Sequence, residues 1–220
     1  MSASKPDFQE MRRRYLDAQL QGDRRAALAL VDGLLAEGAS IGSLRREVVQ
    51  WAQREIGDLW QLDRISVAQE HSATAISQVV LAHLFHRSPL AASRGQRIVI
   101  ACVPGELHEF PARLMADALD AAGYDTHFLG ADVPLAALLH EIERRPPDLL
   151  ALSLTMQFNL ASLFDTLAAV RRAAPLLMLA VGGRAIDESS ERWAELGVAV
   201  AARDAETMIP ALDALLRRAA

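Results

Sequence analysis

Cysteine is almost absent from this chain of 220 residues, since Cys102 is the only one. A lone cysteine excludes an intramolecular disulfide and any zinc site built from several cysteines. Because Cys102 ends an apolar segment, we expect a small buried thiol rather than a reactive one. The sequence also has no run of about 18 apolar residues and no secretory signal at its charged N-terminus, so it predicts a cytoplasmic protein with no membrane partner.

An excess of positive charge is missing as well. The chain carries 23 Lys and Arg against 28 Asp and Glu, for a net charge of −5. The basic clusters at 12–14 and 144–145 lie in helical patterns beside acidic and apolar residues and are typical of solvated helix faces. This balance argues against direct nucleic-acid binding. With 51% hydrophobic residues, the composition indicates a globular protein.

The first part of the chain, residues 1–90, has the rhythm of helices. Apolar residues recur at spacings of three and four, with breaks at Gly22-Asp23 and near Gly38. Ser66 is placed to cap a fourth helix. Four helices with short connections predict an antiparallel four-helix bundle, followed by a linker at 87–96.

The second part, residues 91–220, alternates short apolar runs with amphipathic helices. We expect five strands, at 98–103, 126–129, 149–153, 177–181 and 198–201, each followed by a helix. This order predicts an α/β domain with a doubly wound, flavodoxin-like (Rossmann-type) parallel sheet of five strands. Ligands of such sheets lie at the carboxyl ends of the strands, so the loops after strands one, three and four are the places to search.

The loop after the first strand contains Glu106 and His108. A carboxylate two residues before a histidine can accept the N–H of one ring nitrogen, which makes the other nitrogen a better metal donor. Pro111 fits the first turn of the following helix. On this loop alone, a solvent-exposed histidine beside an acid is the favoured interpretation.

Two further loops give this histidine a context: Ser153-Leu154-Thr155 follows the third predicted strand, and Gly182-Gly183 follows the fourth. The arrangement resembles the cobalamin-binding family that includes methionine synthase and the methylmalonyl-CoA mutases. The signature of that family is Asp-x-His-x-x-Gly, then about 41 residues, Ser-x-Leu, about 26 to 28 residues, and Gly-Gly. Here the segment 106–111 is followed by 41 residues (112–152) before Ser153, and 26 residues (156–181) precede Gly182. The segments 128–130 and 132–134 also resemble the second loop of the family.

The resemblance implies that His108 is the lower axial ligand of cobalt and that the nucleotide tail of cobalamin runs beside the sheet. The residues that it implies for cofactor binding in this domain are Glu106, Leu107, His108, Glu109, Phe110, Ser153, Thr155, Gly182 and Gly183. The chain departs from the family pattern at Glu106, where Asp is usual, at Thr155, where Leu is frequent, and at Pro111, where Gly is usual. The last change puts the path of the tail in question, whereas His108 and both spacings are intact.

The helical part carries a second pattern: Trp60, nine intervening residues, and then Glu70-His71. The third helix ends and the fourth begins there, so the three side chains should lie at one end of the bundle. Taken alone, the pattern fits a tryptophan at the edge of the core and two polar residues on a wet helix face. Together with the sheet motif it resembles the light-sensing adenosylcobalamin proteins of the CarH and LitR type.

That resemblance implies a bundle that caps the upper face of cobalamin, with Trp60 packed on the adenosyl group, Glu70 hydrogen-bonded to it and His71 in the same pocket. Light would release the upper group and shift the bundle, as a ligand-biased switch requires. Adenosylcobalamin is the first expectation and methylcobalamin the alternative. Gln61 stands where some members have a histidine that binds cobalt after illumination. We find no covalent attachment site for a bilin, so a second chromophore is without support.

The usual N-terminal DNA-binding module of these regulators has no counterpart here, because the bundle starts almost at the first residue. We therefore expect signalling through a protein partner or through homo-oligomer formation. The alternatives are a corrinoid methyl carrier of a methyltransferase system and a sheet domain that has lost its cofactor and binds other proteins. No nucleophile and base are spaced as in a self-sufficient active site, which predicts a protein that is not itself an enzyme.

Overall fold

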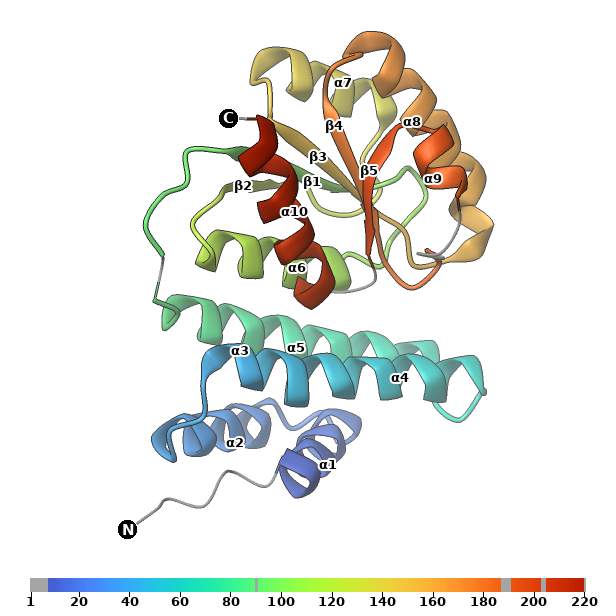
Figure 1. The fold of residues 1–220 in the computed structure, drawn as a ribbon. Coiled ribbons are helices and arrows are strands. Elements are labelled where there is room, and N and C mark those ends of the chain that lie inside the picture. Colours follow the sequence, from blue (N-terminus) through green and yellow to red (C-terminus); the bar gives the residue numbers. More distant parts are fainter. Residues whose placement is uncertain (1–7, 90, 187–190, 203–204, 220) are drawn as a thin grey trace. The chain divides into compact units, whose positions relative to one another are not determined.

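The computed structural model describes residues 8–89, 91–186, 191–202 and 205–219 (Figure 1). The chain divides into two compact units, Met1–Pro89 and Leu90–Ala220. Among the described residues, no helix has both the length and the apolar character needed to cross a membrane. Each unit has its own core, and each is treated below by itself.

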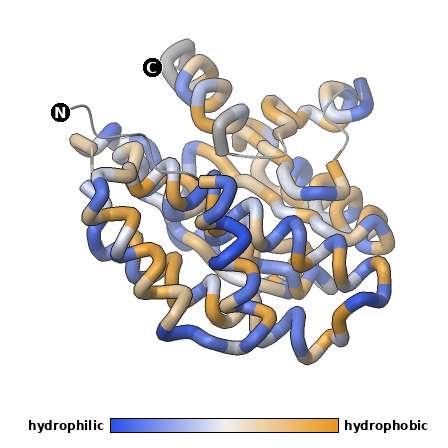
Figure 2. The backbone as a smooth tube through the Cα atoms, turned by 90° about the horizontal axis from the view of Figure 1, so that it is seen from below, coloured by the Kyte–Doolittle hydropathy of each residue, from blue (hydrophilic) through white to orange (hydrophobic). Residues whose placement is uncertain are grey.

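The first unit is helical, as predicted. Its elements are α1 (Phe8–Leu20), α2 (Arg24–Ala36), the short α3 (Ile41–Ser43), the π-helical segment η1 (Leu44–Gln50), α4 (Trp51–Gln61) and α5 (Val67–His86). Helix α1 packs against α2, α4 and α5. Figure 2 shows hydrophilic and hydrophobic stretches alternating along these helices, as amphipathic helices of a bundle require.

Local sequence signals set the helix ends. Asp23 caps α2 by accepting a hydrogen bond from the N–H of Ala26. Ser66 and Gln69 form a reciprocal capping box at the start of α5, so the predicted cap at Ser66 is confirmed. The predicted third helix differs from expectation, because α3, η1 and α4 run on through a π-helical stretch. In this stretch the adjacent pairs 44–45 and 48–49 are buried.

The second unit is built on a parallel sheet with the strand order β2-β1-β3-β4-β5, which confirms the predicted flavodoxin-like topology. The strands are β1 (Arg97–Cys102), β2 (Asp125–Phe128), β3 (Leu149–Ser153), β4 (Met178–Gly182) and β5 (Val198–Ala202). The helices are α6 (Phe110–Ala121), α7 (Leu135–Arg144), α8 (Leu160–Ala173), α9 (Arg192–Glu195) and α10 (Ala205–Ala219), with the 3₁₀ turn η2 (Gln157–Asn159) before α8.

Alternate residues of the strands fill two cores. Side chains such as Val99 and Leu150 pack with α7, α8 and α9, while Ile98 and Leu149 pack with α6 and α10. Figure 1 shows these two groups of helices on opposite faces of the sheet. This near-continuous burial of β1 and β3 is typical of a parallel sheet that is covered on both faces.

Several boundaries differ from those predicted: β1 and β2 begin and end one residue earlier than expected, and β5 ends one residue later. Strand β4 extends to Gly182, so this glycine ends the strand rather than starting the loop. The helix expected near 188–196 is observed as Arg192–Glu195, and residues 187–190 lie outside the described residues. The predicted linker is partly fixed, because the N–H groups of Ala91 and Arg94 donate to the carbonyls of Ala121 and Gly123.

Candidate functional site

The carboxyl ends of three neighbouring strands bring the predicted loops together. In the sheet register, Cys102 of β1 pairs with Ser153 of β3, and Ser153 pairs with Gly182 of β4. The loop that carries His108 follows β1, and β1 lies between β2 and β3, where the order of the strands reverses. In this topology the reversal opens a crevice for ligands.

Glu106 and His108 form the pair that the sequence predicts. The Nδ1 atom of His108 lies 2.7 Å from Oε1 of Glu106, and the backbone N–H of His108 donates to the same oxygen at 2.9 Å. The imidazole is about one-third exposed, whereas the carboxylate is fully buried. With Nδ1 donating to the carboxylate, the neutral ring has its lone pair on Nε2, which is the form that binds a metal.

The other oxygen of Glu106 is held by the loop after β3. Its Oε2 accepts hydrogen bonds from the N–H groups of Thr155 and Met156, both at 2.9 Å, and from Nδ2 of Asn159 at 3.3 Å. Burial on its own raises the pKa of Glu106, but the hydrogen bonds from His108, Met156 and Thr155 together lower this pKa to about 2. The carboxylate is therefore a fixed negative charge behind the histidine.

Additional bonds fix the backbone around this pair. The N–H of Gly105 donates to Oδ1 of Asp132 at 2.7 Å, and Asn159 donates from Nδ2 to the carbonyl of Gly105 at 3.2 Å. Ser162 donates to the carbonyl of Pro104 at 2.7 Å. The sequence reasoning missed Asn159 and Ser162 as supports of the site, because a link across more than 50 residues leaves no periodic signal.

Two large apolar side chains are exposed beside the pair. Leu107 is 70% exposed and adjoins His108, and Phe158 of η2 is 74% exposed and adjoins Asn159, which binds Glu106. Leu107 was predicted from the motif, whereas Phe158 was not. In the sequence, an isolated phenylalanine in a loop does not indicate a binding site. In the structure, Phe158 adjoins Asn159, which contacts the Glu106 carboxylate. Both side chains can cover the apolar part of a ligand.

Thr155 combines two properties of a binding residue. Its N–H is used by Glu106, while its Oγ1 is buried and has no hydrogen-bond partner among the residues that the structure describes. A buried hydroxyl without a partner is costly unless a ligand or a water satisfies it. Ser153, the neighbouring predicted residue, is itself buried at the end of β3.

Packing within the sheet unit explains why positions 182 and 183 are glycines. Gly183 has φ +111°, and a Cβ there would lie 2.3 Å from the carbonyl oxygen of Leu154. A Cβ at Gly182 would lie 3.0 Å from the carbonyl oxygen of Ala202. The sequence suggested that these glycines let a backbone approach a ligand, but the close approach observed is between neighbouring loops and strands.

Two further predicted residues, Glu109 and Phe110, stand at the end of the first loop and the start of the next helix. Phe110 begins α6 and is buried. A Cβ at Gly130, in the loop after β2, would lie 3.3 Å from Oε2 of Glu109. Cys102 is buried as predicted; burial, and then the charges of Glu106 and Glu109, raise its pKa to about 12, so it remains a neutral thiol.

In the helical unit, the predicted Trp60, Glu70 and His71 lie at the end where α4 stops and α5 begins. Trp60 packs against a buried cluster of Ile56, Ile65 and Ala73. Nε2 of His71 lies 3.6 Å from Oε2 of Glu70, and the His71 side chain is largely exposed while that of Glu70 is mostly covered. This end of the bundle thus presents an indole, a carboxylate and an imidazole on consecutive helices.

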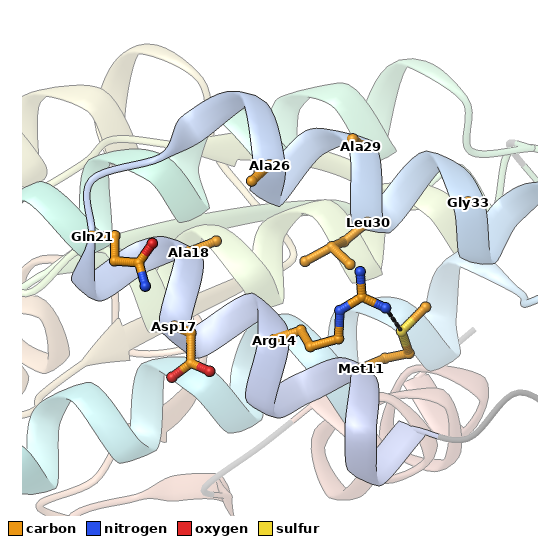
Figure 3. Close-up of a pocket in the computed structure, with 9 residues that line it drawn as sticks. All are labelled: Met11, Arg14, Asp17, Ala18, Gln21, Ala26, Ala29, Leu30 and Gly33. Atoms are coloured by element: carbon orange, nitrogen blue, oxygen red, sulfur yellow. Dashed lines mark hydrogen bonds between the residues drawn. The ribbon is translucent and has the colours of Figure 1, made fainter.

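The same unit has an open groove of about 540 Å³ between α1 and α2 (Figure 3). Small residues of α2, among them Ala26, Ala29 and Gly33, form one wall, and Arg14 of α1 bonds to the sulfur of Met11 on the other. None of the predicted site residues lines this groove. Its size alone therefore does not connect it to the chemistry described above.

Comparison with protein families gives two matches. A model of the B12 binding domain matches residues 96–213, the part of the chain that holds the sheet and the His108 loop. A second model, also described as a B12 binding domain, matches residues 11–85, which hold the helices.

Two relatives of this chain are named as transcriptional repressors. The chain is 33% identical over 132 residues to the HTH-type transcriptional repressor CarH of Myxococcus xanthus, covering 60% of this chain and 44% of that protein. It is 31% identical over 135 residues to the repressor CarA of the same organism, covering 61% and 46%. The aligned part of the chain thus spans less than half the length of these relatives.

Among solved structures, the monomethylamine corrinoid protein of Methanosarcina barkeri superposes with a TM-score of 0.76 at 20% identity. The superposition covers 96% of this chain and 99% of that one. At this identity the likeness establishes a shared fold.

Proposed function

Because the chain belongs to the family of B12-binding domains, whose model matches more than half of its residues, we propose that it is a cobalamin-dependent regulatory switch. His108 is the lower axial ligand of cobalt in this proposal. The observation that carries it is the 2.7 Å contact between Nδ1 of His108 and the buried carboxylate of Glu106.

The residues at the sheet edge fit a corrinoid. The Glu106 carboxylate fixes the tautomer of His108 and raises the basicity of Nε2, the atom that would ligate cobalt. Leu107 and Phe158 supply exposed apolar surface for the macrocycle. The buried Oγ1 of Thr155 supplies a hydroxyl without a partner in the described structure, which a polar group of the nucleotide tail could satisfy.

We assign the upper ligand to the helical unit. Trp60 offers a flat apolar face for an adenine base, and Glu70 offers carboxylate oxygens that accept hydrogen bonds from ribose hydroxyls. His71, whose Nε2 lies 3.6 Å from Glu70, belongs to the same group. Bound adenosylcobalamin would supply a cobalt–carbon bond that visible light cleaves.

Regulation is supported by the identity of about one-third to CarH and CarA, which are named as transcriptional repressors. In our proposal, loss of the upper group frees Trp60 and Glu70 from their contacts and changes the position of the helical unit. The output then passes through a protein partner or through self-association. Gln61, next to Trp60, offers no imidazole to the cobalt, so His71 is the nearest candidate for that role in this unit.

A second candidate function is that of a methyl-carrying corrinoid protein. It is favoured by the superposition on the monomethylamine corrinoid protein, which covers nearly the full length of both chains. The CarH repressor, in contrast, is more than twice as long as the part that aligns with this chain. A carrier needs the same lower ligand but presents a methyl group, for which the indole of Trp60 and the carboxylate of Glu70 have no clear use.

Reconstitution in the dark separates the two functions. The protein is loaded with adenosylcobalamin or methylcobalamin and illuminated with green light, while absorption spectra and molecular mass in solution are followed. A switch shows a light-driven change of spectrum together with a change of mass or of protease sensitivity. Binding with no light-dependent change in the protein favours the carrier, and no spectral shift on mixing overturns cobalamin ligation.

A further inference from the structure

A chain of buried polar contacts ends at Glu70. On α5, the hydroxyl of Thr74 lies 2.9 Å from Oε1 of Glu70 and 3.1 Å from Oε1 of Gln53, which belongs to α4. Thr74 is half-buried, and the Glu70 side chain is mostly covered. The carboxylate is therefore held by a specific partner within its own helical unit.

The orientation of the Gln53 amide follows from its other contacts. Its Nε2 donates to Oγ of Ser77 at 2.8 Å and lies 3.4 Å from the carbonyl oxygen of Ala73. A reversed amide would place a carbonyl oxygen against the Ala73 carbonyl, so the acceptor Oε1 must face Thr74.

Ser77 continues the chain into the core. Its hydroxyl oxygen also accepts from Nε2 of Gln19 at 2.7 Å and lies 3.1 Å from the hydroxyl of Tyr15. With both lone pairs taken by the two amides, the Ser77 proton goes to Tyr15. The polar groups of α1, α4 and α5 thus have an ordered pattern of donors and acceptors. This pattern fixes the orientation of the Gln53 amide.

One hydroxyl proton then faces two acceptors. Thr74 has a single O–H, and both Oε1 of Glu70 and Oε1 of Gln53 accept from it. We infer that Thr74 is a positioning residue for the upper-ligand site: by donating to Oε1 it sets the direction of the Glu70 carboxylate, and Gln53 competes for the same proton. This inference rests on the proposed role of Glu70.

Because Glu70 and Gln53 share one proton donor, two substitutions distinguish a positioning role of Thr74 from a purely structural one. Thr74→Val keeps the shape of the side chain and removes the donor to Glu70. Gln53→Met removes the competing acceptor and leaves the Thr74 proton to Glu70, although it deletes two contacts of the Gln53 amide with the core. A purely structural network predicts that Gln53→Met is the more harmful change for every property.

The test measures dissociation constants for adenosylcobalamin and hydroxocobalamin in the dark and compares their ratio between variants. Wild type is expected to prefer the adenosyl form. Thr74→Val should reduce that preference by about three- to tenfold, the range of one hydrogen bond. Thr74→Ser, Gln53→Met and the exposed hydroxyl control Ser72→Ala should keep it. Thermal unfolding of the unloaded proteins establishes that each variant is folded.

The results distinguish the positioning role of Thr74 from the proposed role of Glu70 in binding the upper ligand. A preference that falls in Glu70→Gln but is unchanged in Thr74→Val overturns the inference and leaves the proposed function standing. A preference that tracks the unfolding temperature, with Gln53→Met the worst, overturns it too. Equal affinity of wild type for the two forms overturns the proposed role of Glu70 together with the inference.

Discussion

Oε1 of Glu106 accepts two hydrogen bonds from one residue, since both the backbone N–H and the ring Nδ1 of His108 donate to it, at 2.9 and 2.7 Å. This double contact ties the orientation of the imidazole to the backbone of its own loop. A histidine held in this way is ready to bind a metal through Nε2 without first ordering its side chain, which lowers the entropic cost of ligation.

Replacing Glu106 by glutamine should weaken cobalamin binding by about 10- to 100-fold, the usual effect of losing the partner of a metal-bound histidine. Both carboxylate oxygens accept hydrogen bonds from N–H groups, so the amide nitrogen of the new side chain would face donors whichever way it turned. Spectrophotometric titration of Glu106→Gln gives the affinity. Glu106→Asp, which keeps the charge, is the control, and equal losses in both variants would contradict the role of the charge.

The stability of the unloaded protein should fall in acid because of the same group. The pKa of Glu106 is about 2 in the folded protein against 4.5 in the unfolded chain. A lowered folded-state pKa contributes stability that is complete above pH 4.5 and is lost as the pH falls through about 2; here it amounts to about 3 kcal/mol. Urea unfolding of wild type and Glu106→Gln between pH 6 and pH 2.5 checks this, and parallel pH profiles would refute it.

Phe158→Ala should separate binding from stability. The side chain is 74% exposed, so its removal should change the free energy of unfolding by less than about 0.5 kcal/mol. If it covers the macrocycle, the affinity for cobalamin should fall by about tenfold through lost apolar contact. Leu176→Ala, at a side chain that is 96% exposed, is the matched control and should leave both quantities unchanged.

Gly183→Ala should destabilise the sheet unit by about 1–3 kcal/mol, because φ is +111° and the new methyl group would meet the Leu154 carbonyl at 2.3 Å. Gly33→Ala in α2 has open space and should stabilise the protein by about 0.5–1 kcal/mol. Denaturant unfolding measures both. A neutral effect at Gly183 would mean that the contact with Leu154 relaxes easily.

The sequence predicts local features of this site well. The pairing of Glu106 with His108 depends only on two residues in one loop, and the topology follows from the alternation of apolar strands and amphipathic helices. Once the strand order is known, the register places Cys102, Ser153 and Gly182 side by side.

Contacts between distant segments could not be predicted in the same way. Asn159 reaches Glu106 from 53 residues away, and Gln53 meets Thr74 across two helices. Polar partners of this kind depend on how the helices pack, and a single sequence does not encode that in its periodicity. The π-helical stretch Leu44–Gln50 was missed because its apolar spacing also fits an ordinary helix.

The central claim is that Nε2 of His108 ligates cobalt, and electron paramagnetic resonance tests it most directly. Protein labelled with ¹⁵N only in histidine is loaded with cob(II)alamin of natural isotope content, and the splitting of the cobalt signal by the axial nitrogen is recorded. A doublet, from one ¹⁵N nucleus, is the predicted result, and it should disappear in His108→Ala. A triplet from ¹⁴N, which shows that cobalamin keeps its own base, would contradict the account.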